Sequence, residues 1–153
     1  NKLLSALTLP WIRLIARTRP LQGEVRVVRQ FDARCDALWA RVAPQFAFGV
    51  RRDAAYLNWK YIQAPHVRYS IATLERDGEL GGYVVYRHVQ EPRGRVTLVV
   101  DWLTDPQDAS GFLTLLRWVD REARTANSDK IRAFAMHAGY RKHLKAEGYF
   151  AVK

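Results

Sequence analysis

One carboxylate in the sequence is placed where it could take part in proton transfer. Asp101 lies within residues 96–104, which form the most apolar strand-like stretch of the chain. A carboxyl group buried among apolar neighbours has a raised pKa, so it could accept a proton from an ammonium group. The alternative is a structural carboxylate that pairs with an arginine or with backbone N–H groups. The residues alone leave both roles open for Asp101.

The segment after Asp101 could bind an anion. A polar loop at residues 105–111 separates the strand from an amphipathic helix predicted at residues 112–126. The first N–H groups of a helix have no partner within the helix, and the helix dipole favours negative charge at that end. Strand, loop and helix together therefore form a candidate phosphate site.

The elements around this segment predict a sheet. An apolar run such as 96–104 is typical of a central strand covered on both faces. Strand patterns at residues 67–74 and 80–88 are joined by an Asp-Gly pair, a strong hairpin signal, so three strands form an antiparallel meander. Residues 130–136 form a strand that we expect to run parallel to 96–104, because a helix crosses between the two.

The remaining elements complete an α/β (α+β) domain. They are a strand at residues 24–31, helices at 32–42, 51–61 and 140–146, and a last strand at 149–152. Asp32 and Asp53 are the expected N-caps of the first two helices, and Gly148 ends the third. We therefore predict one domain at residues 24–153, with a mixed, mostly antiparallel sheet flanked by helices.

Residues 1–19 form a separate segment. They are mostly apolar, with Arg13 and Arg17 one helical turn apart. The run is too short to span a bilayer, and Pro10 interrupts it. We expect a connector helix packed on this or a neighbouring domain; an amphipathic helix on a membrane surface is the alternative. Because the first residue is Asn1, we expect the chain to be processed or part of a longer protein.

Composition limits the partners and the compartment. The 153-residue chain has a formal net charge of +10, mostly from scattered arginines. This charge favours anionic partners such as nucleotide phosphates, nucleic acid, acidic lipid or an acidic substrate, although a mixed solvated surface explains it equally well. The single cysteine, Cys35, allows no internal disulfide, so we expect a buried thiol and a cytoplasmic protein. No Cys/His spacing suggests zinc, and we predict no metal site.

The order of these elements resembles that of the GNAT acyltransferase superfamily. A closer resemblance is carried by residues 52–65, RDAAYLNWKYIQAP, by residues 82–87, GYVVYR, and by Val100-Asp101. These runs, with Phe31-Asp32 and Leu38-Trp39, are similar to a group of bacterial GNAT-like proteins in which an RDxxYLxWRY-type run precedes the meander. In several of these proteins a second GNAT domain comes first. The resemblance thus implies a C-terminal GNAT domain of a longer protein, with residues 1–19 as the connector.

The resemblance also implies a reaction. It implies transfer of an acyl group from acetyl-CoA or another acyl-CoA to an amine acceptor, with pantetheine between the central strand and its parallel neighbour. The pyrophosphate would meet the loop that follows the strand. The implied catalytic residues are Asp101 as the base and Tyr140 as the acid that protonates the thiolate. The implied donor-binding residues are Trp102, Leu103, Thr104, Ser110 and Gly111.

Some residues depart from the superfamily pattern. Asp108 stands where a glutamine or arginine is expected, and Leu113 replaces a small residue. A carboxylate beside a pyrophosphate is repulsive at short range. In the superfamily a tyrosine often acts as the general acid on the thiolate. Leu144 occupies that position here, and Tyr140 lies one helical turn earlier. His137, which ends the strand at 130–136, is a further candidate for the site.

Two alternatives to an active acyltransferase therefore stay open. The first is a degenerate GNAT-fold domain with a structural or acceptor-binding role in a tandem protein. The second is a basic module that binds nucleic acid or a membrane surface, based on the net charge and on aromatic residues near arginines and lysines at 51–61. No nucleic-acid-binding motif supports this second alternative.

Overall fold

The structure is a computed structural model that describes residues 22–47, 49–135 and 137–150. The predicted connector at residues 1–19 lies outside these ranges, as do residues 151–152 of the last predicted strand.

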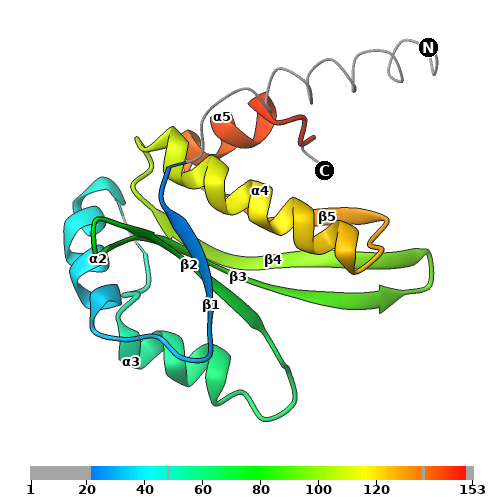
Figure 1. Ribbon diagram of the computed structural model, residues 1–153, viewed down its shortest axis with the longest axis horizontal. Coiled ribbons are helices and arrows are strands. Elements are labelled where there is room, and N and C mark those ends of the chain that lie inside the picture. Colours follow the sequence, from blue (N-terminus) through cyan, green and yellow to red (C-terminus); the bar gives the residue numbers. More distant parts are fainter. Residues whose placement is uncertain (1–21, 48, 136, 151–153) are drawn as a thin grey trace.

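A five-stranded sheet forms the centre of the domain (Figure 1). In order across the sheet, its strands are β1 (Glu24–Val28), β2 (Ser70–Arg76), β3 (Glu79–Glu91), β4 (Gly94–Thr104) and β5 (Lys130–Ala133). Neighbouring strands from β1 to β4 are antiparallel, and β5 pairs parallel with β4. The prediction of a mixed, mostly antiparallel sheet is confirmed.

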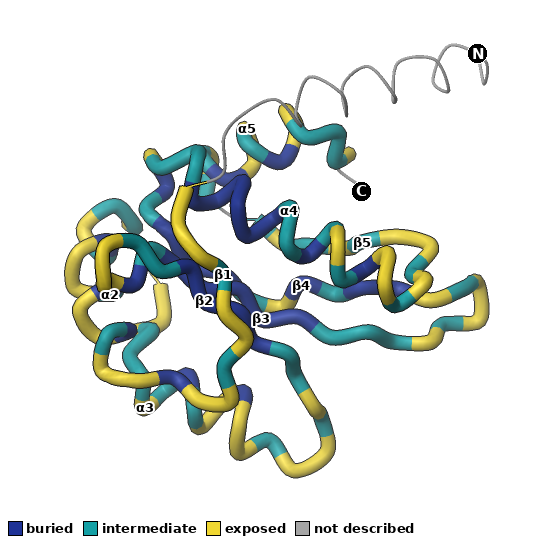
Figure 2. Tube along the Cα trace, in the orientation of Figure 1, coloured by how far each residue is buried: buried dark blue, intermediate teal, exposed yellow. Residues whose placement is uncertain are grey.

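Helices cover both faces of the sheet (Figure 1). They are α2 (Arg34–Val42) and α3 (Ala54–Leu57) on one face, and α4 (Ala109–Thr125) and α5 (Ala138–Ala146) on the other. A short 3-10 turn, Ala43–Gln45, follows α2, and a π-helical turn, Asn58–Ile62, continues α3. Figure 2 shows buried residues concentrated along the middle strands and along one side of α4.

The two faces of the sheet hold separate apolar cores. Leu38, Leu57 and Tyr83 belong to the core beneath α2 and α3, whereas Tyr86 and Phe112 belong to the core beneath α4 and α5. Each core is formed by alternate residues of the strands, because successive side chains of a strand point to opposite faces. The central strands are therefore covered on both sides, as their apolar composition predicts.

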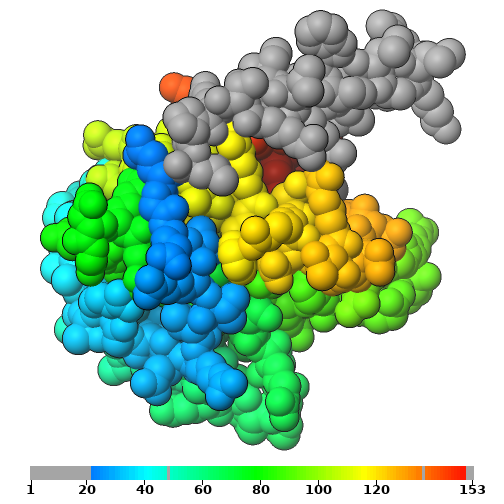
Figure 3. All heavy atoms as spheres, viewed as in Figure 1, coloured from blue at the N-terminus to red at the C-terminus, as the bar shows by residue number. Residues whose placement is uncertain are grey.

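β1 forms one edge of the sheet, and Figure 3 shows it exposed at the surface of the molecule. Glu24 and Arg26 on this strand form an exposed ion pair of 2.8 Å. Charged side chains on an edge strand disfavour pairing with another chain.

Local signals in the sequence correctly located several turns and caps. Asp77 and Gly78 have positive φ angles of 50° and 81°, which suit the predicted hairpin turn. Asp53 caps α3 by accepting a hydrogen bond from the Tyr56 N–H. Gly148 follows α5 with a φ of 85°, as expected for a residue that ends a helix.

Other boundaries were wrong. The residue directly before α2 is Ala33 rather than Asp32, although the Asp32 carboxylate still accepts a hydrogen bond from the Arg34 N–H in the first turn and pairs with the Arg34 side chain. α4 begins at Ala109 rather than at residue 112. Tyr149 and Phe150 are not in a strand, because the Tyr149 N–H bonds to the Leu144 carbonyl at the end of α5.

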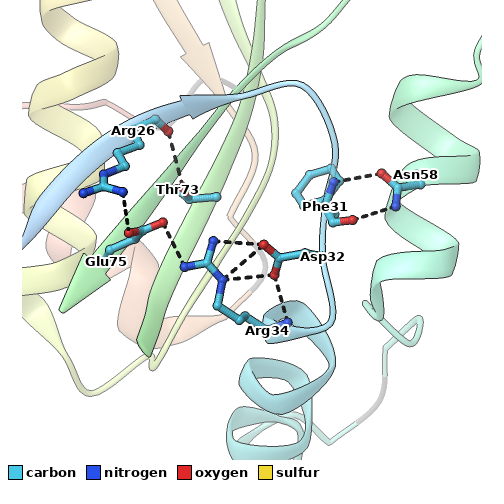
Figure 4. Close-up of polar contacts among 7 residues, drawn as sticks. All are labelled: Arg26, Phe31, Asp32, Arg34, Asn58, Thr73 and Glu75. Carbon is cyan, nitrogen blue, oxygen red and sulfur yellow. Dashed lines mark hydrogen bonds and ion pairs between the residues drawn. The ribbon is translucent and has the colours of Figure 1, made fainter. Parts of the chain in front are cut away.

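Side-chain bonds attach α2 to β2 and the π-helical turn to the loop between β1 and α2 (Figure 4). The Asn58 amide donates to the Phe31 carbonyl at 2.8 Å and accepts from the Phe31 N–H at 2.9 Å. Arg34 lies between Asp32 and Glu75 of β2, with 2.9 Å to each carboxylate. These contacts keep the segment between β1 and α2 in one position, and so they position the residues of α3 as well.

The buried thiol of Cys35 provides a test of this packing. Cys35 is only 2% exposed, and burial raises the pKa of its thiol to about 12. We expect the folded protein to react slowly with a thiol reagent between about pH 7 and 10, because the thiolate is the reactive form. Rates measured with and without urea check this. An exposed thiol has a pKa of about 8.5, so its rate of reaction with the reagent would instead rise steeply across this pH range.

Candidate functional site

A β-bulge in β4 determines where the site lies. Val85 of β3 pairs with Asp101, whereas the next residue, Tyr86, pairs with Val99, so Val100 is an extra residue in β4. The parallel pairing with β5 ends at the same point, at Val99 and Ala133. Beyond the bulge, β4 continues to Thr104 with β3 as its only paired neighbour among the described strands. The expected parallel pair is confirmed over this first half, and β5 is shorter than predicted.

Asp101 faces the side of the sheet covered by α2 and α3. Its side chain is 10% exposed, and both carboxylate oxygens lie near Nε of Arg52, at 3.3 and 3.4 Å. The Tyr83 hydroxyl donates to Asp101 at 3.1 Å. The alternative role considered for Asp101, a carboxylate paired with an arginine, is thus present in the structure.

Two buried tyrosines share this cluster. Burial raises the pKa of Tyr83, and the charge of Asp101 raises it further; the same two causes raise the pKa of Tyr61. Both hydroxyls therefore stay protonated near neutral pH. Tyr61 is 4% exposed, and its hydroxyl makes no hydrogen bond of good geometry, although it lies close enough to Asp101 for that carboxylate to affect its pKa. A buried polar group of this kind can bond to water or to a ligand.

Arg52 carries the positive charge of the cluster. Burial alone would lower its pKa, but the neighbouring Asp101 and the two tyrosines raise it overall. Arg52 and Asp101 thus form a partly buried ion pair in which the Asp101 carboxylate favours the charged form of Arg52. We call Asp101, Arg52, Tyr83 and Tyr61 the Asp101 cluster.

The three residues after Asp101 contribute to both cores and to the strand edge. Trp102 packs on the α4 side, with its ring edge-to-face on Phe112 at 5.1 Å between centroids. Leu103 packs in the core beneath α2 and α3. Thr104 is fully buried, and its backbone bonds to Tyr140 rather than to β5.

Tyr140 binds the free edge of β4. Its hydroxyl donates to the Thr104 carbonyl at 2.6 Å and accepts from the Thr104 N–H at 3.1 Å. The residue is 3% exposed, and its ring stacks on Phe112. Burial raises the pKa of Tyr140, so its hydroxyl stays protonated. The structure therefore gives Tyr140 a backbone partner, and its predicted role as an acid stays a prediction.

An internal carboxylate occupies the N-terminus of α4. Asp108 is the N-cap, and its Oδ1 accepts from the Gly111 N–H at 3.0 Å. Its Oδ2 pairs with Nη1 of Arg76, at the end of β2, at 2.5 Å. Ser110 lies in the same group, with its hydroxyl 3.3 Å from Nη2 of Arg76. This helix end, predicted as a phosphate site, is filled by the chain itself.

His137 has a structural partner. Its side chain caps α5 by accepting from the Gly139 N–H at 3.1 Å, and its ring packs against Phe46 and Tyr140. The described part of the chain has no group of three or more His, Cys, Asp or Glu side chains that could hold a metal ion. Within it, no helix is long and apolar enough to cross a membrane.

The main residues missed by sequence reasoning are the partners of the two carboxylates. Arg52 lies 49 positions before Asp101, and Arg76 lies 32 positions before Asp108. The sequence indicates Arg52 as the first residue of the run at 52–65 and as a basic residue near aromatic ones, but not as the partner of Asp101. No local pattern indicates Arg76. Tyr61 and Tyr83 belonged to recognised runs but had no predicted role.

Comparison with known proteins identifies the fold. No protein-family model matches the sequence, and no curated protein matches it significantly. Solved structures do match over most of their length. An aminoglycoside N-acetyltransferase, AAC(6')-Iy, in complex with CoA is 12% identical with a TM-score of 0.57, over 85% of this chain and 93% of that chain.

Two further structures agree. A ribosomal-protein-alanine N-acetyltransferase from Brucella melitensis biovar Abortus 2308 is 17% identical with a TM-score of 0.59, over 84% of this chain and 93% of that chain. The wild-type protein TTHA1254 from Thermus thermophilus is 19% identical with a TM-score of 0.56, over 85% of this chain and 95% of that chain. The domain has the GNAT acetyltransferase fold. At these identities the likeness shows the fold alone.

The bonds between Tyr140 and Thr104 can be tested by stability. Tyr140→Phe removes the hydroxyl and leaves two buried backbone groups of Thr104 without this partner. We expect the free energy of unfolding to fall by about 1–3 kcal/mol, measured by urea denaturation. Tyr56→Phe is the matched control, because it keeps the ring that lies under Lys60. An equal loss in both variants would contradict the assigned bonds.

Proposed function

We propose that this domain is an acyl-CoA-dependent N-acyltransferase that transfers an acetyl or other acyl group to an amine. The observation that carries the proposal is the position of Asp101 directly after the bulge, where β4 loses β5 as its neighbour. The solved structures with a similar fold include two acetyltransferases, one of them in complex with CoA, and they support the same class of reaction. Both are named N-acetyltransferases, which also supports an amine as the acceptor.

The Asp101 cluster would act on the acceptor. Asp101 would accept the proton that the amine must lose before it can attack a carbonyl carbon. Tyr83 and Arg52 hold the carboxylate in place, because each bonds to or pairs with its oxygens. The Tyr61 hydroxyl, which lies near Asp101 without a hydrogen bond of good geometry, would bond to the amine or to a water molecule beside it.

The expected acyl-CoA site has a pantetheine end at β4 and a pyrophosphate end at the N-terminus of α4, and only the first could accept its part of the donor. The backbone of Trp102 to Thr104 lies at the free edge of β4 and could bond to a pantetheine arm if the Tyr140 hydroxyl moved away. A protonated Tyr140 could then donate its proton to a departing thiolate. The N-terminus of α4 does not fit a pyrophosphate, because Asp108 occupies it.

This misfit supports a second candidate, in which the domain does not bind the donor. Asp108 fills the helix N-terminus and Tyr140 fills the strand edge at Thr104. A preceding GNAT-like domain of the same protein would then bind acyl-CoA, and this domain would contribute acceptor binding or packing. Both candidates agree with a cytoplasmic location.

Calorimetric titration with acetyl-CoA separates the two candidates. The first predicts saturable binding and acetylation of a primary amine from a panel of test amines. No heat and no thermal shift at millimolar acetyl-CoA would remove the first candidate for this domain and leave the second.

Asp101→Asn tests the proposed base. It keeps the shape of the side chain but removes its ability to accept a proton, so we expect the transfer rate to fall by about 10²–10⁴-fold with donor binding unchanged. Initial rates at a fixed pH with saturating acetyl-CoA check this. Asp120→Asn, which alters an exposed pair with Arg124, is the control and should keep the wild-type rate. Unchanged activity of Asp101→Asn would exclude Asp101 as the base.

A further inference from the structure

The carboxylate at the start of α4 uses the groups that would otherwise bind a phosphate. Asp108 accepts from the Gly111 N–H with its side chain and from the Phe112 N–H with its backbone carbonyl. The Ala109 N–H bonds to the Gln107 carbonyl. A helix N-terminus binds anions through its first N–H groups, and of these the Ala109 and Gly111 N–H groups have partners within the chain, whereas the Phe112 bond is the first regular bond of the helix.

The nearby cation is also occupied. Arg76 reaches the helix from β2 and places Nη1 against Asp108 Oδ2 at 2.5 Å and Nη2 3.3 Å from the Ser110 hydroxyl. Its Nε donates to the Gln22 carbonyl at 3.3 Å. Only about a quarter of the Arg76 and Asp108 side chains is exposed, at 25% and 26%. The guanidinium that could bind an incoming phosphate is thus held by the carboxylate.

The glycine at this turn serves the same ion pair. A Cβ atom added to Gly111 would overlap with Asp108 Oδ2 and lie 3.1 Å from Arg76 Nη2. The absence of a side chain at Gly111 therefore leaves room for the Asp108 carboxylate and the Arg76 guanidinium in their present positions. The presence of this glycine, which from the sequence suggested a phosphate-binding loop, is explained by contacts within the chain.

We propose that this domain recognises its donor by the acyl-pantetheine thioester alone, and that Asp108 excludes a donor pyrophosphate from the N-terminus of α4. The inference rests on the proposed acyltransferase function. It defines the donor class as acyl-pantetheine thioesters, for which the nucleotide part of CoA adds no contact at this helix. A pyrophosphate placed there would meet a carboxylate whose counter-ion is already Arg76.

A comparison of two donors tests the donor class. S-acetyl-pantetheine carries the same thioester as acetyl-CoA but lacks the pyrophosphate and the nucleotide. We expect the two donors to have kcat/KM values within about threefold of each other. A preference for acetyl-CoA of more than about 100-fold would overturn the proposal, because the interactions with the nucleotide part would then contribute most of the donor recognition.

A second measurement tests the role of Asp108 without any turnover. Inorganic pyrophosphate is titrated into the wild-type protein, Asp108→Asn and Asp108→Ser, with Asp120→Asn as a control on the same helix. Asparagine and serine still cap a helix, but neither carries the negative charge that holds Arg76. We expect binding and a raised Tm for the two Asp108 variants only.

The outcomes distinguish this inference from the proposed function. If neither donor is turned over while the Asp108 variants alone bind pyrophosphate, the acyltransferase function fails and the exclusion by Asp108 stands. If wild type and variants behave alike, whether all bind pyrophosphate or none does, Asp108 does not exclude it and the inference is overturned.

Discussion

The extra residue Val100 in β4 sets the geometry on which the candidate site depends. Val99 and Trp102 both belong to the α4 side of the sheet although they are three positions apart, which a regular strand does not allow. Without the bulge, Asp101 would share the face of Val99 and point into the apolar core under α4. With it, Asp101 reaches Arg52 and Tyr83 on the opposite side, and the pairing with β5 stops.

Both carboxylates of this region are stabilised in the same way. Asp101 pairs with Arg52 and Asp108 pairs with Arg76, and in each case the arginine comes from an earlier and distant segment. Removing water from a carboxylate is costly unless a counter-charge and hydrogen bonds replace it. Part of the high arginine content therefore serves contacts inside the domain, in addition to any role in attracting anionic partners.

The two pairs differ in what they leave available. In the Asp101 cluster, the Tyr61 hydroxyl lies beside a carboxylate and makes no hydrogen bond of good geometry. The Asp108 pair leaves the N-terminus of α4 filled, and Tyr140 occupies the backbone of Thr104. The α2 and α3 side of β4, with the Asp101 cluster, can thus bind a polar group, whereas the side with Tyr140 and the N-terminus of α4 is closed by contacts within the chain. A GNAT fold accommodates either state, because function depends on the site rather than on the fold.

The sequence by itself determined the order and type of most elements, although not of the last one, predicted as a strand at residues 149–152. The Asp-Gly turn, the Asp53 cap and the apolar runs act through the nearest residues, so the strands of the meander, the parallel β5 and the helices over both faces were predictable. The start of α4 and the end of β5 were not. The first depends on how Asp108 is held, and the second on a register shift in another strand pair. The partners of Asp101, Asp108 and Thr104 lie 49, 32 and 36 positions away, and only the folded sheet brings them together. Tertiary structure alone therefore decided that a loop with the outline of a phosphate site is occupied by its own aspartate, because ion pairing depends on distance in space and leaves no local pattern in the sequence.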